Sequence, residues 1–409
     1  RAAARPRGVV TSVSEPLASR VDDARRRLAE RAGLTPSEVS VVISPYRVCP
    51  IGAHSDHQGG PVLAMAVSAY TLVAFAPARS SDVTLTSDNF SGEVSFDLAR
   101  PVVDALPSWG AYPAGAARAI GERHPLARGI VGHVHGSLPG GGLSSSASVT
   151  LAYLMAFAAA NGTTLDPTAL VDLALRAERD FVGVKVGILD PAAIVGARRD
   201  HLLAIETRER RWRSLAVGQD APEYRILVAF SGITRNLSGT DFNRRIDECF
   251  DAARGLAARA GRDDVAGLHD LTDEVFEAHG AGLSGPQQRR ARHFFGERSR
   301  VRRGATAWQA SDLATFGQLM RESCTSSIDN WEAGSPELIA IQQVLTETGG
   351  VFGSRFSGAG WGGCCVALIE AERASEIVRQ IEAAIRSRLP ELTAARVLLV
   401  ESEDGLRMA

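Results

Sequence analysis

The sequence predicts an α+β fold divided into two domains. A length of 409 residues with 45% hydrophobic content is ample for a buried core, and it favours two domains over one. Strand-like and helix-like segments both occur, but without the regular alternation that builds a doubly wound parallel sheet. Gly218, Asp220 and Pro222 interrupt the pattern, so we expect the domains to span residues 1–215 and 216–409.

Apolar runs rich in β-branched residues predict the strands, and apolar residues at 3.6-residue spacing predict the helices. Asn161-Gly162 should end the first predicted helix, and Asp166-Pro167 should cap the second. The predicted strands are 39–43, 83–86, 130–134, 225–230, 364–369 and 397–400. The predicted helices are 144–160, 168–179, 243–260, 311–323, 336–348 and 372–388.

The composition argues against several classes of function. A formal net charge of -2 gives no electrostatic attraction to nucleic acid or to an acidic membrane surface. No apolar stretch approaches the roughly 20 residues needed to span a bilayer. Five cysteines, an odd number, fit a reducing compartment. The arginine-rich runs 25–27 and 289–292 are interpreted as solvated helix faces. We therefore expect a cytoplasmic protein without a nucleic-acid or membrane partner, and among the oligomeric states left open a monomer is favoured.

A glycine-rich stretch, SLPGGGLSSSAS at 137–148, follows a predicted strand and leads directly into a predicted helix. Successive glycines allow the backbone to approach an anion closely and to take positive φ values. The hydroxyl and N–H groups of the following helix N-terminus would then face that anion. The stretch is either such a phosphate cradle or a flexible turn before a helix. It is not a Walker A loop, because no Gly-Lys-Ser/Thr occurs.

Two further stretches carry glycines. SPYRVCPIGAHSDHQGG at 44–60 places Arg47, His54, Asp56 and His57 around three glycines, which is dense for a simple connector. A metal site is the alternative, but no cysteine or spaced histidine cluster supports zinc. RFSGAGWGGCCVAL at 355–368 is by itself consistent with an ordinary tight turn.

Together the three stretches resemble, in order and separation, the three motifs of the GHMP small-molecule kinases. Within these they are similar to the galactokinase branch, whose first motif runs Gly-Arg-Val-Asn-Leu-Ile-Gly-Glu-His-Thr-Asp-Tyr. The resemblance extends through GILD at 187–190, Trp109-x-x-Tyr112 and SSIDNWEAGSPEL at 326–338. It implies a two-domain GHMP fold with the active site in the interdomain cleft. It also implies that ATP phosphorylates the anomeric C1 hydroxyl of a sugar, with Mg²⁺ as cofactor.

The resemblance implies roles for individual residues. Asp190 would lie beside the C1 hydroxyl, either as its base or only to orient it, and Arg47 would stabilise the transferring phosphoryl group. Ser146 and Glu178 would hold Mg²⁺, unless Glu178 is only a solvated helix carboxylate. The implied ATP-binding residues are Trp109, Tyr112, Gly140, Gly141, Gly142, Ser144, Ser145 and Ser146. The implied sugar-binding residues are Arg47, Ala53, His54, Asp56, Lys185, Gly187, Asp190 and Phe242.

Two departures from the galactokinase pattern indicate the sugar. Ala53 replaces the glutamate that meets the C6 hydroxyl, and Lys185, the only lysine in the chain, replaces a proline. One change removes an anion and the other adds a cation, so a C6 carboxylate would gain from both. Two carboxylates ~4 Å apart at an effective dielectric of ~20 repel by ~4 kcal/mol. The pattern thus resembles the galacturonokinases, which implies D-galacturonate as substrate and D-galacturonate 1-phosphate as product.

Several alternatives stay open. Phe242 replaces a tyrosine that contacts the C4 hydroxyl, so D-glucuronate is a competing substrate. Pro191 replaces a glutamine, and we have no physical account of that change. A second alternative is a galactokinase or a promiscuous sugar kinase. In that case the single lysine, Lys185, reflects codon usage that favours arginine and has no role in sugar binding. A non-catalytic sugar sensor is disfavoured, because the residues implied in transfer are all present.

Overall fold

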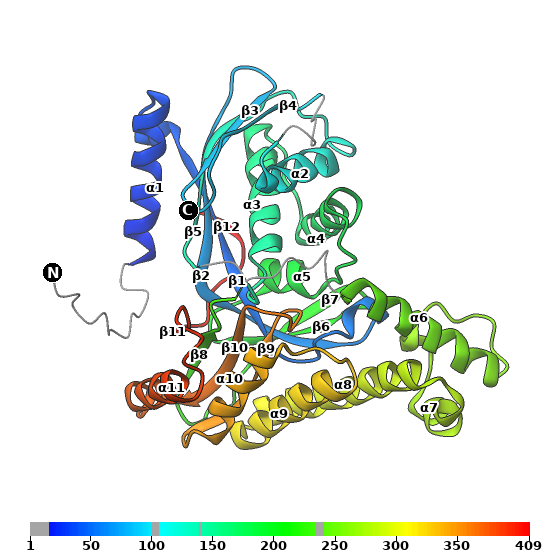
Figure 1. The fold of residues 1–409 in the computed structure, drawn as a ribbon. Coiled ribbons are helices and arrows are strands. Elements are labelled where there is room, and N and C mark those ends of the chain that lie inside the picture. The colour runs from blue at the N-terminus through cyan, green and yellow to red at the C-terminus, as the bar shows by residue number, and fades with distance from the viewer. Residues whose placement is uncertain (1–15, 100–105, 139–140, 234–240) are drawn as a thin grey trace.

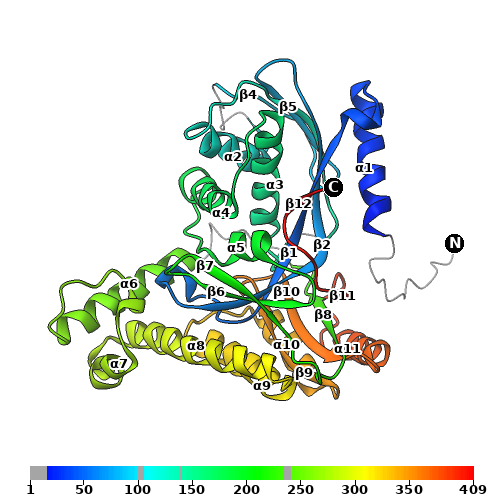
Figure 2. The same cartoon turned by 180° about the vertical axis from the view of Figure 1, so that it is seen from behind.

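The computed structural model describes residues 16–99, 106–138, 141–233 and 241–409. Two β-sheets form its framework, and helices cover their outer faces (Figures 1 and 2). The predicted α+β class is confirmed.

The first sheet has the strand order β12-β1-β2-β5-β3-β4, with β6 paired to β2 and β7 paired to β6. The edge strand β12 comes from the C-terminal end of the chain. Its residues Met408 and Arg407 pair with Val42 and Ile43 of β1. The chain after residue 216 therefore contributes to both sheets, and the domain division at 215/216 stays a prediction. The strands are β1 (Ser40–Ile51), β2 (Val62–Pro77), β3 (Asp82–Ser87), β4 (Val94–Asp97), β5 (Ile130–Gly136), β6 (His201–Glu206), β7 (Arg211–Ala216) and β12 (Arg407–Met408).

Helices lie on both faces of the first sheet (Figures 1 and 2). α1 (Leu17–Ala32) packs on one face, and α2 (Ala111–Gly121), α3 (Ser145–Ala160), α4 (Pro167–Arg176) and α5 (Leu189–Gly196) cover the other. α3 is apolar around most of its circumference, which is why it occupies the centre of this layer. The predicted cap at Asp166 is confirmed, because its Oδ1 accepts a hydrogen bond from the N–H of Ala169 at 2.8 Å.

The second sheet is antiparallel, in the order β11 (Arg396–Val400), β8 (Tyr224–Phe230), β10 (Cys364–Glu370), β9 (Val351–Ser357). Its helices are α6 (Phe242–Arg259), α7 (Asp273–His279), α8 (Gly285–Gln309), α9 (Leu313–Asp329), α10 (Pro336–Glu347) and α11 (Ala374–Arg388). One shared apolar core, with Met65 of β2, Val366 of β10 and Trp308 of α8 among its members, joins the two sheets. The sheets are thereby fixed relative to each other.

The predicted strands and helices all occur, with shifted ends. The predicted helix 168–179 is wrong at its end, because α4 stops at Arg176 and a π-helical turn follows at Ala177–Val182. The largest omissions are the 16-residue β2 and the 25-residue α8. The interpretation of 289–292 as a solvated face holds for the exposed Arg292 but is wrong for Arg290, which is fully buried and pairs with Glu248 and Glu332 at 2.7 and 2.5 Å.

All five cysteines are buried and free. Within the described ranges, no helix is both long and apolar enough to cross a bilayer. The expected cytoplasmic location and monomeric state stay predictions.

Candidate active site

A cavity of about 920 Å³ opens where the first sheet and α3 face the turn between β9 and β10. All three glycine-bearing stretches contribute to its wall, as expected for a cleft between two domains. The following predicted site residues line it: Arg47, Ala53, His54, Asp56, Trp109, Tyr112, Gly141, Gly142, Ser144, Ser145, Ser146, Glu178, Gly187, Asp190 and Phe242. Gly140 lies outside the described residues, and Lys185 is not among the lining residues.

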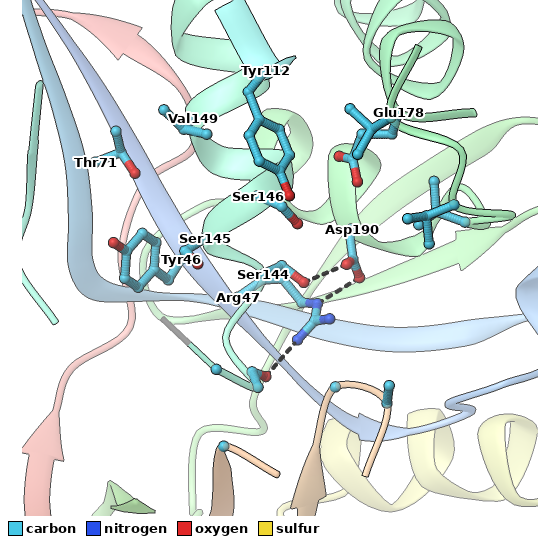
Figure 3. Close-up of a pocket in the computed structure, with 18 of the residues that line it drawn as sticks. Tyr46, Arg47, Thr71, Tyr112, Ser144, Ser145, Ser146, Val149, Glu178 and Asp190 are labelled. Carbon is cyan, nitrogen blue, oxygen red and sulfur yellow. Dashed lines mark hydrogen bonds and ion pairs between the residues drawn. The ribbon is translucent and has the colours of Figure 1, made fainter. Parts of the chain in front are cut away.

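Asp190 sits in the first turn of α5 and receives a hydrogen bond on each carboxylate oxygen (Figure 3). Arg47 donates from Nε to Oδ1 at 2.7 Å, and the Ser144 hydroxyl donates to Oδ2. Such charge-assisted bonds fix the position and orientation of the carboxylate. Arg47 is 3% exposed. Burial opposes its charge, but Asp190 more than compensates and raises the pKa of Arg47. Arg47 of β1, Ser144 of the glycine-rich loop and Asp190 of α5 are thus connected by hydrogen bonds, and we call these three residues the Asp190 unit.

The glycine-rich loop owes its course to positive φ values. Gly142 has φ 83° and Ser144, the N-cap of α3, has φ 57°. The loop packs backbone to backbone on the third glycine-bearing stretch. A Cβ on Gly142 would lie 2.9 Å from the Ser357 carbonyl oxygen, and one on Gly363 would lie 2.6 Å from Gly141. The last stretch is therefore more than a tight turn, because its backbone packs directly against the glycine-rich loop.

Glu178, Ser146 and Tyr112 direct their oxygen atoms toward the space beside Asp190 (Figure 3). Glu178 is 5% exposed, which excludes the alternative that it is a solvated helix carboxylate. Burial, and then the negative charge of Asp190, raise the pKa of Glu178 to about 8. A cation that lies between two carboxylates facing the same space lowers the repulsion between them. Hard oxygen donors of this kind suit Mg²⁺, whose remaining ligands would be phosphates and water.

No group of three His, Cys, Asp or Glu residues that could hold a metal ion occurs in the described part of the chain. A site made of Ser146 and Glu178 supplies only two protein ligands. It therefore fits a metal that arrives with a phosphate ligand better than a resident ion held by the protein alone.

The other end of the cavity is built from rings. His54 has φ 64° and is 8% exposed, and its imidazole stacks on Trp331 with ring centres 5.0 Å apart and planes 7° apart. Its Nε2 is buried without a hydrogen-bond partner. Burial, reinforced by His293 and Arg355, places the pKa of His54 well below its usual value, so the ring is neutral. The rings of Phe242 and His54 pack in an edge-to-face arrangement, with their centres 6.4 Å apart.

Asp56 and Gly187 meet at the floor of this ring-lined end. Asp56 accepts a hydrogen bond from the N–H of Leu189 at 3.0 Å. A Cβ at position 187 would lie 1.8 Å from Oδ2 of Asp56, so only glycine fits there. Burial raises the pKa of Asp56, an effect that Asp190 adds to and the Leu189 N–H opposes.

Lys185 lies at the rim rather than in the cavity. Its ammonium pairs with Asp247 of α6 at 2.7 Å, and the two side chains are 53% and 59% exposed. Its neighbours Val184 and Val186 do line the cavity. Any electrostatic effect of Lys185 on a ligand is therefore screened by solvent and shared with Asp247.

Trp109 is only 7% exposed and belongs to the apolar core around α2 and α3. Its indole N–H donates to the carbonyl of Ser91 at 3.3 Å. It reaches the cavity with part of its surface. A role in stacking on adenine stays a prediction.

Several residues that contact this site were not predicted. His293 and Glu297 of α8 hold the backbone of the first motif, and Trp331 stacks on His54. Ser357 accepts a hydrogen bond from Arg47 at 3.4 Å. The stretch SSIDNWEAGSPEL was a usable signal for Trp331, but nothing in the arginine-rich sequence of α8 marked His293 or Glu297.

Comparisons with known proteins agree with this geometry. The family profiles "GHMP kinases N terminal domain", "GHMP kinases C terminal" and "Galactokinase galactose-binding signature" match residues 111–197, 305–386 and 30–77. The chain is 35% identical to a galacturonokinase from Arabidopsis thaliana, over 97% of this chain and 100% of the relative. It is 32% identical to a galactokinase from Roseiflexus sp., over 85% and 87%. The galactokinase of Lactococcus lactis complexed with galactose superimposes with a TM-score of 0.87 at 26% identity, covering 96% and 100%.

Proposed function

Because the chain belongs to the GHMP kinases, in their galactokinase branch, and is a sugar 1-kinase, we propose that its substrate is a uronic acid, D-galacturonate. The product is then D-galacturonate 1-phosphate, and ATP is the phosphoryl donor. The observation that carries the choice of sugar is Ala53, at the position where galactokinases have a glutamate facing C6. Ala53 lines the ring-lined end of the cavity.

In this proposal the Asp190 unit acts on the C1 hydroxyl. Asp190 accepts a hydrogen bond from that hydroxyl and orients its oxygen toward the γ-phosphate of ATP. Arg47 holds Asp190 through Nε, and its guanidinium stabilises the charge that develops on the transferring group. The hydroxyls and N–H groups at the start of α3 bind phosphate oxygens. The chemistry therefore needs no covalent enzyme intermediate.

Ser146 and Glu178 would hold Mg²⁺, with Tyr112 beside them. When bound, Mg²⁺ would supply positive charge that offsets the negative charge of the phosphates. The buried Glu178 carboxylate would gain a counter-charge from the same ion. The raised pKa of Glu178 supports this assignment, because it indicates that no cation of the protein compensates that carboxylate fully.

The carboxylates among the described lining residues are Asp56, Glu178 and Asp190, and position 53 adds no further carboxylate to the cavity. A C6 carboxylate would thus avoid the repulsion that a glutamate at position 53 would cause. The Nε2 atom of the neutral His54 imidazole has no hydrogen-bond partner. Protonated at Nε2, the ring can donate a hydrogen bond to a C6 carboxylate or to a C6 hydroxyl. The 35% identity to a galacturonokinase over the whole relative supports the same choice.

Galactose is the competing substrate, because the galactose-binding signature matches residues 30–77 and several relatives are galactokinases. A coupled ADP-release assay with Mg-ATP compares D-galacturonate, D-glucuronate and D-galactose at equal concentrations. We expect the highest kcat/KM with galacturonate. Preference for glucuronate would be consistent with a uronic acid as substrate. It would indicate that the enzyme selects the other configuration of the C4 hydroxyl, the group that Phe242 is predicted to face. Preference for galactose would refute the argument from Ala53.

A further inference from the structure

Three successive residues of the first motif are each held by a residue that does not line the cavity. Gly52 donates its N–H to Oε2 of Glu297 at 2.5 Å. Ala53 accepts at its carbonyl oxygen from Nε2 of His293 at 2.9 Å. His54 has its ring stacked on Trp331. We call Glu297, His293 and Trp331 the brace.

The brace is buried and internally connected. Glu297, His293 and Trp331 each have 0% exposure. Glu297 also accepts from the Ser323 hydroxyl at 2.9 Å and from Arg300 at 2.7 Å. His293 Nδ1 lies 2.9 Å from the hydroxyl of Ser326. Because Nε2 of His293 must donate to the Ala53 carbonyl, Nδ1 of the neutral ring accepts from Ser326.

The loop needs external support, because its conformation is strained. His54 has a positive φ of 64° without being glycine, and such a conformation persists only where its surroundings fix it. Gly52 has φ 99°, and a Cβ there would lie 2.8 Å from Val301 of α8. The loop is thus pressed against α8, and the brace contacts lie on that side.

We propose that Glu297, His293 and Trp331 are positioning residues that set the His54 imidazole and the 52–54 backbone for sugar binding. α8, together with Trp331 just after α9, thereby determines sugar affinity without touching the sugar. The transfer end is held separately, through Arg47, Ser144 and Asp190. Loss of the brace therefore weakens sugar binding and leaves nucleotide binding intact. The inference rests on the proposed sugar site but not on the identity of the sugar.

The test compares Glu297→Ala with Glu297→Gln, using whichever sugar the wild-type enzyme phosphorylates best. The alanine variant lacks an acceptor for the Gly52 N–H, whereas the glutamine oxygen can still accept it. We expect the alanine variant to raise the sugar KM at least tenfold, with the ATP KM within twofold. The glutamine variant should recover most of the sugar affinity.

Glu403→Gln is the matched control, because Glu403 is another buried carboxylate, 2% exposed, that pairs with Arg199 at 2.6 Å and accepts from Tyr70. Its hydrogen-bond and ion-pair partners are Tyr70, Ala66, Arg199, Asp404 and Arg407 rather than residues 52–54, so its loss should lower thermal stability without raising the sugar KM. The proposal fails if Glu297→Ala changes both KM values in parallel, or if it lowers stability alone as the control does.

If Glu297→Ala does not fold, His293→Leu and His293→Gln decide on the same criterion. Leucine cannot donate to the Ala53 carbonyl, whereas the glutamine amide can. A raised sugar KM for leucine with recovery for glutamine supports the brace. Equal kinetics for the two variants overturn it. Since every comparison is made with the preferred sugar, none of these outcomes depends on galacturonate being that sugar.

Discussion

At the transfer end of the cavity both oxygens of Asp190 accept hydrogen bonds, whereas at the sugar end the buried Nε2 of His54 has no partner among the described residues. The first arrangement is complete before any ligand arrives. The second is neutral, ring-lined and unsaturated in hydrogen bonds. Under the proposed function, contacts within the protein fix the geometry of phosphoryl transfer, whereas groups with unused hydrogen-bonding capacity select the sugar.

The largest effect is expected from breaking the transfer end. Asp190→Asn keeps the shape of the side chain but removes its charge and its ability to take a proton. We expect kcat to fall by roughly a thousandfold or more, with ATP affinity within a few fold. ADP release measures the first and calorimetric titration with ATP the second. Asp180→Asn, an exposed carboxylate in the same π-helical turn as Glu178, is the control. Activity within tenfold of wild type would remove Asp190 from the transfer step.

The next effect concerns charge at the sugar end. Ala53→Glu restores an anion where a uronic acid carries its own. Repulsion of about 4 kcal/mol corresponds to roughly a thousandfold loss of kcat/KM for galacturonate. Galactose turnover should be unchanged or improved. Ala53→Gln has nearly the same volume without the charge, so it separates crowding from repulsion. Equal losses for the glutamine and glutamate variants would contradict the electrostatic argument.

The same contrast explains how far the sequence could predict the site. Arg47, Ser144 and Asp190 belong to motifs whose spacing reports their chemistry, and the structure brings them together. The ring-lined end depends on packing between distant segments, which spacing does not report. Arg290 illustrates this limit, because its run of arginines predicts a solvated face and yet Glu248 and Glu332 compensate its burial. Trp331 and His293 acquire their roles only where α8 and the end of α9 meet the first motif.

His57 lies beside Trp331, with ring centres 5.2 Å apart, and offers a measure of the packing around Trp331 that is independent of activity. Burial, and then His293, lower the pKa of His57 from its usual 6.5 to about 3. Between these values the unfolded chain binds a proton that the folded chain does not, so stability is full above pH 6.5 and is lost as the pH falls. His57→Phe keeps a ring but cannot titrate. When the pH is lowered from 7.5 to 5, the free energy of unfolding should fall in both proteins. We expect the fall to be about 2 kcal/mol smaller in His57→Phe than in wild type.

Urea unfolding at pH 7.5 and pH 5 measures this difference. His201→Phe is the control, because His201 is only partly buried at the start of β6 and its Nδ1 has a partner in the Arg199 carbonyl. Identical pH dependence of wild type and His57→Phe would show that water reaches the His57 ring and that the region around Trp331 is more hydrated than its ring packing suggests.

The smallest effect is expected at the rim, where Lys185 and Asp247 form an exposed pair. A screened pair of this kind contributes at most about 1 kcal/mol, or roughly fivefold in kcat/KM. If the ammonium attracts a uronic acid, Lys185→Met should lower galacturonate kcat/KM within that limit and leave galactose unchanged. Asp247→Asn, which frees the ammonium, should have the opposite sign, and salt should weaken both effects. If instead both substitutions affect both sugars equally, Lys185 only ties the segment before Asp190 to α6. Recognition of the carboxylate then rests on the absence of an anion at position 53 rather than on the presence of a cation.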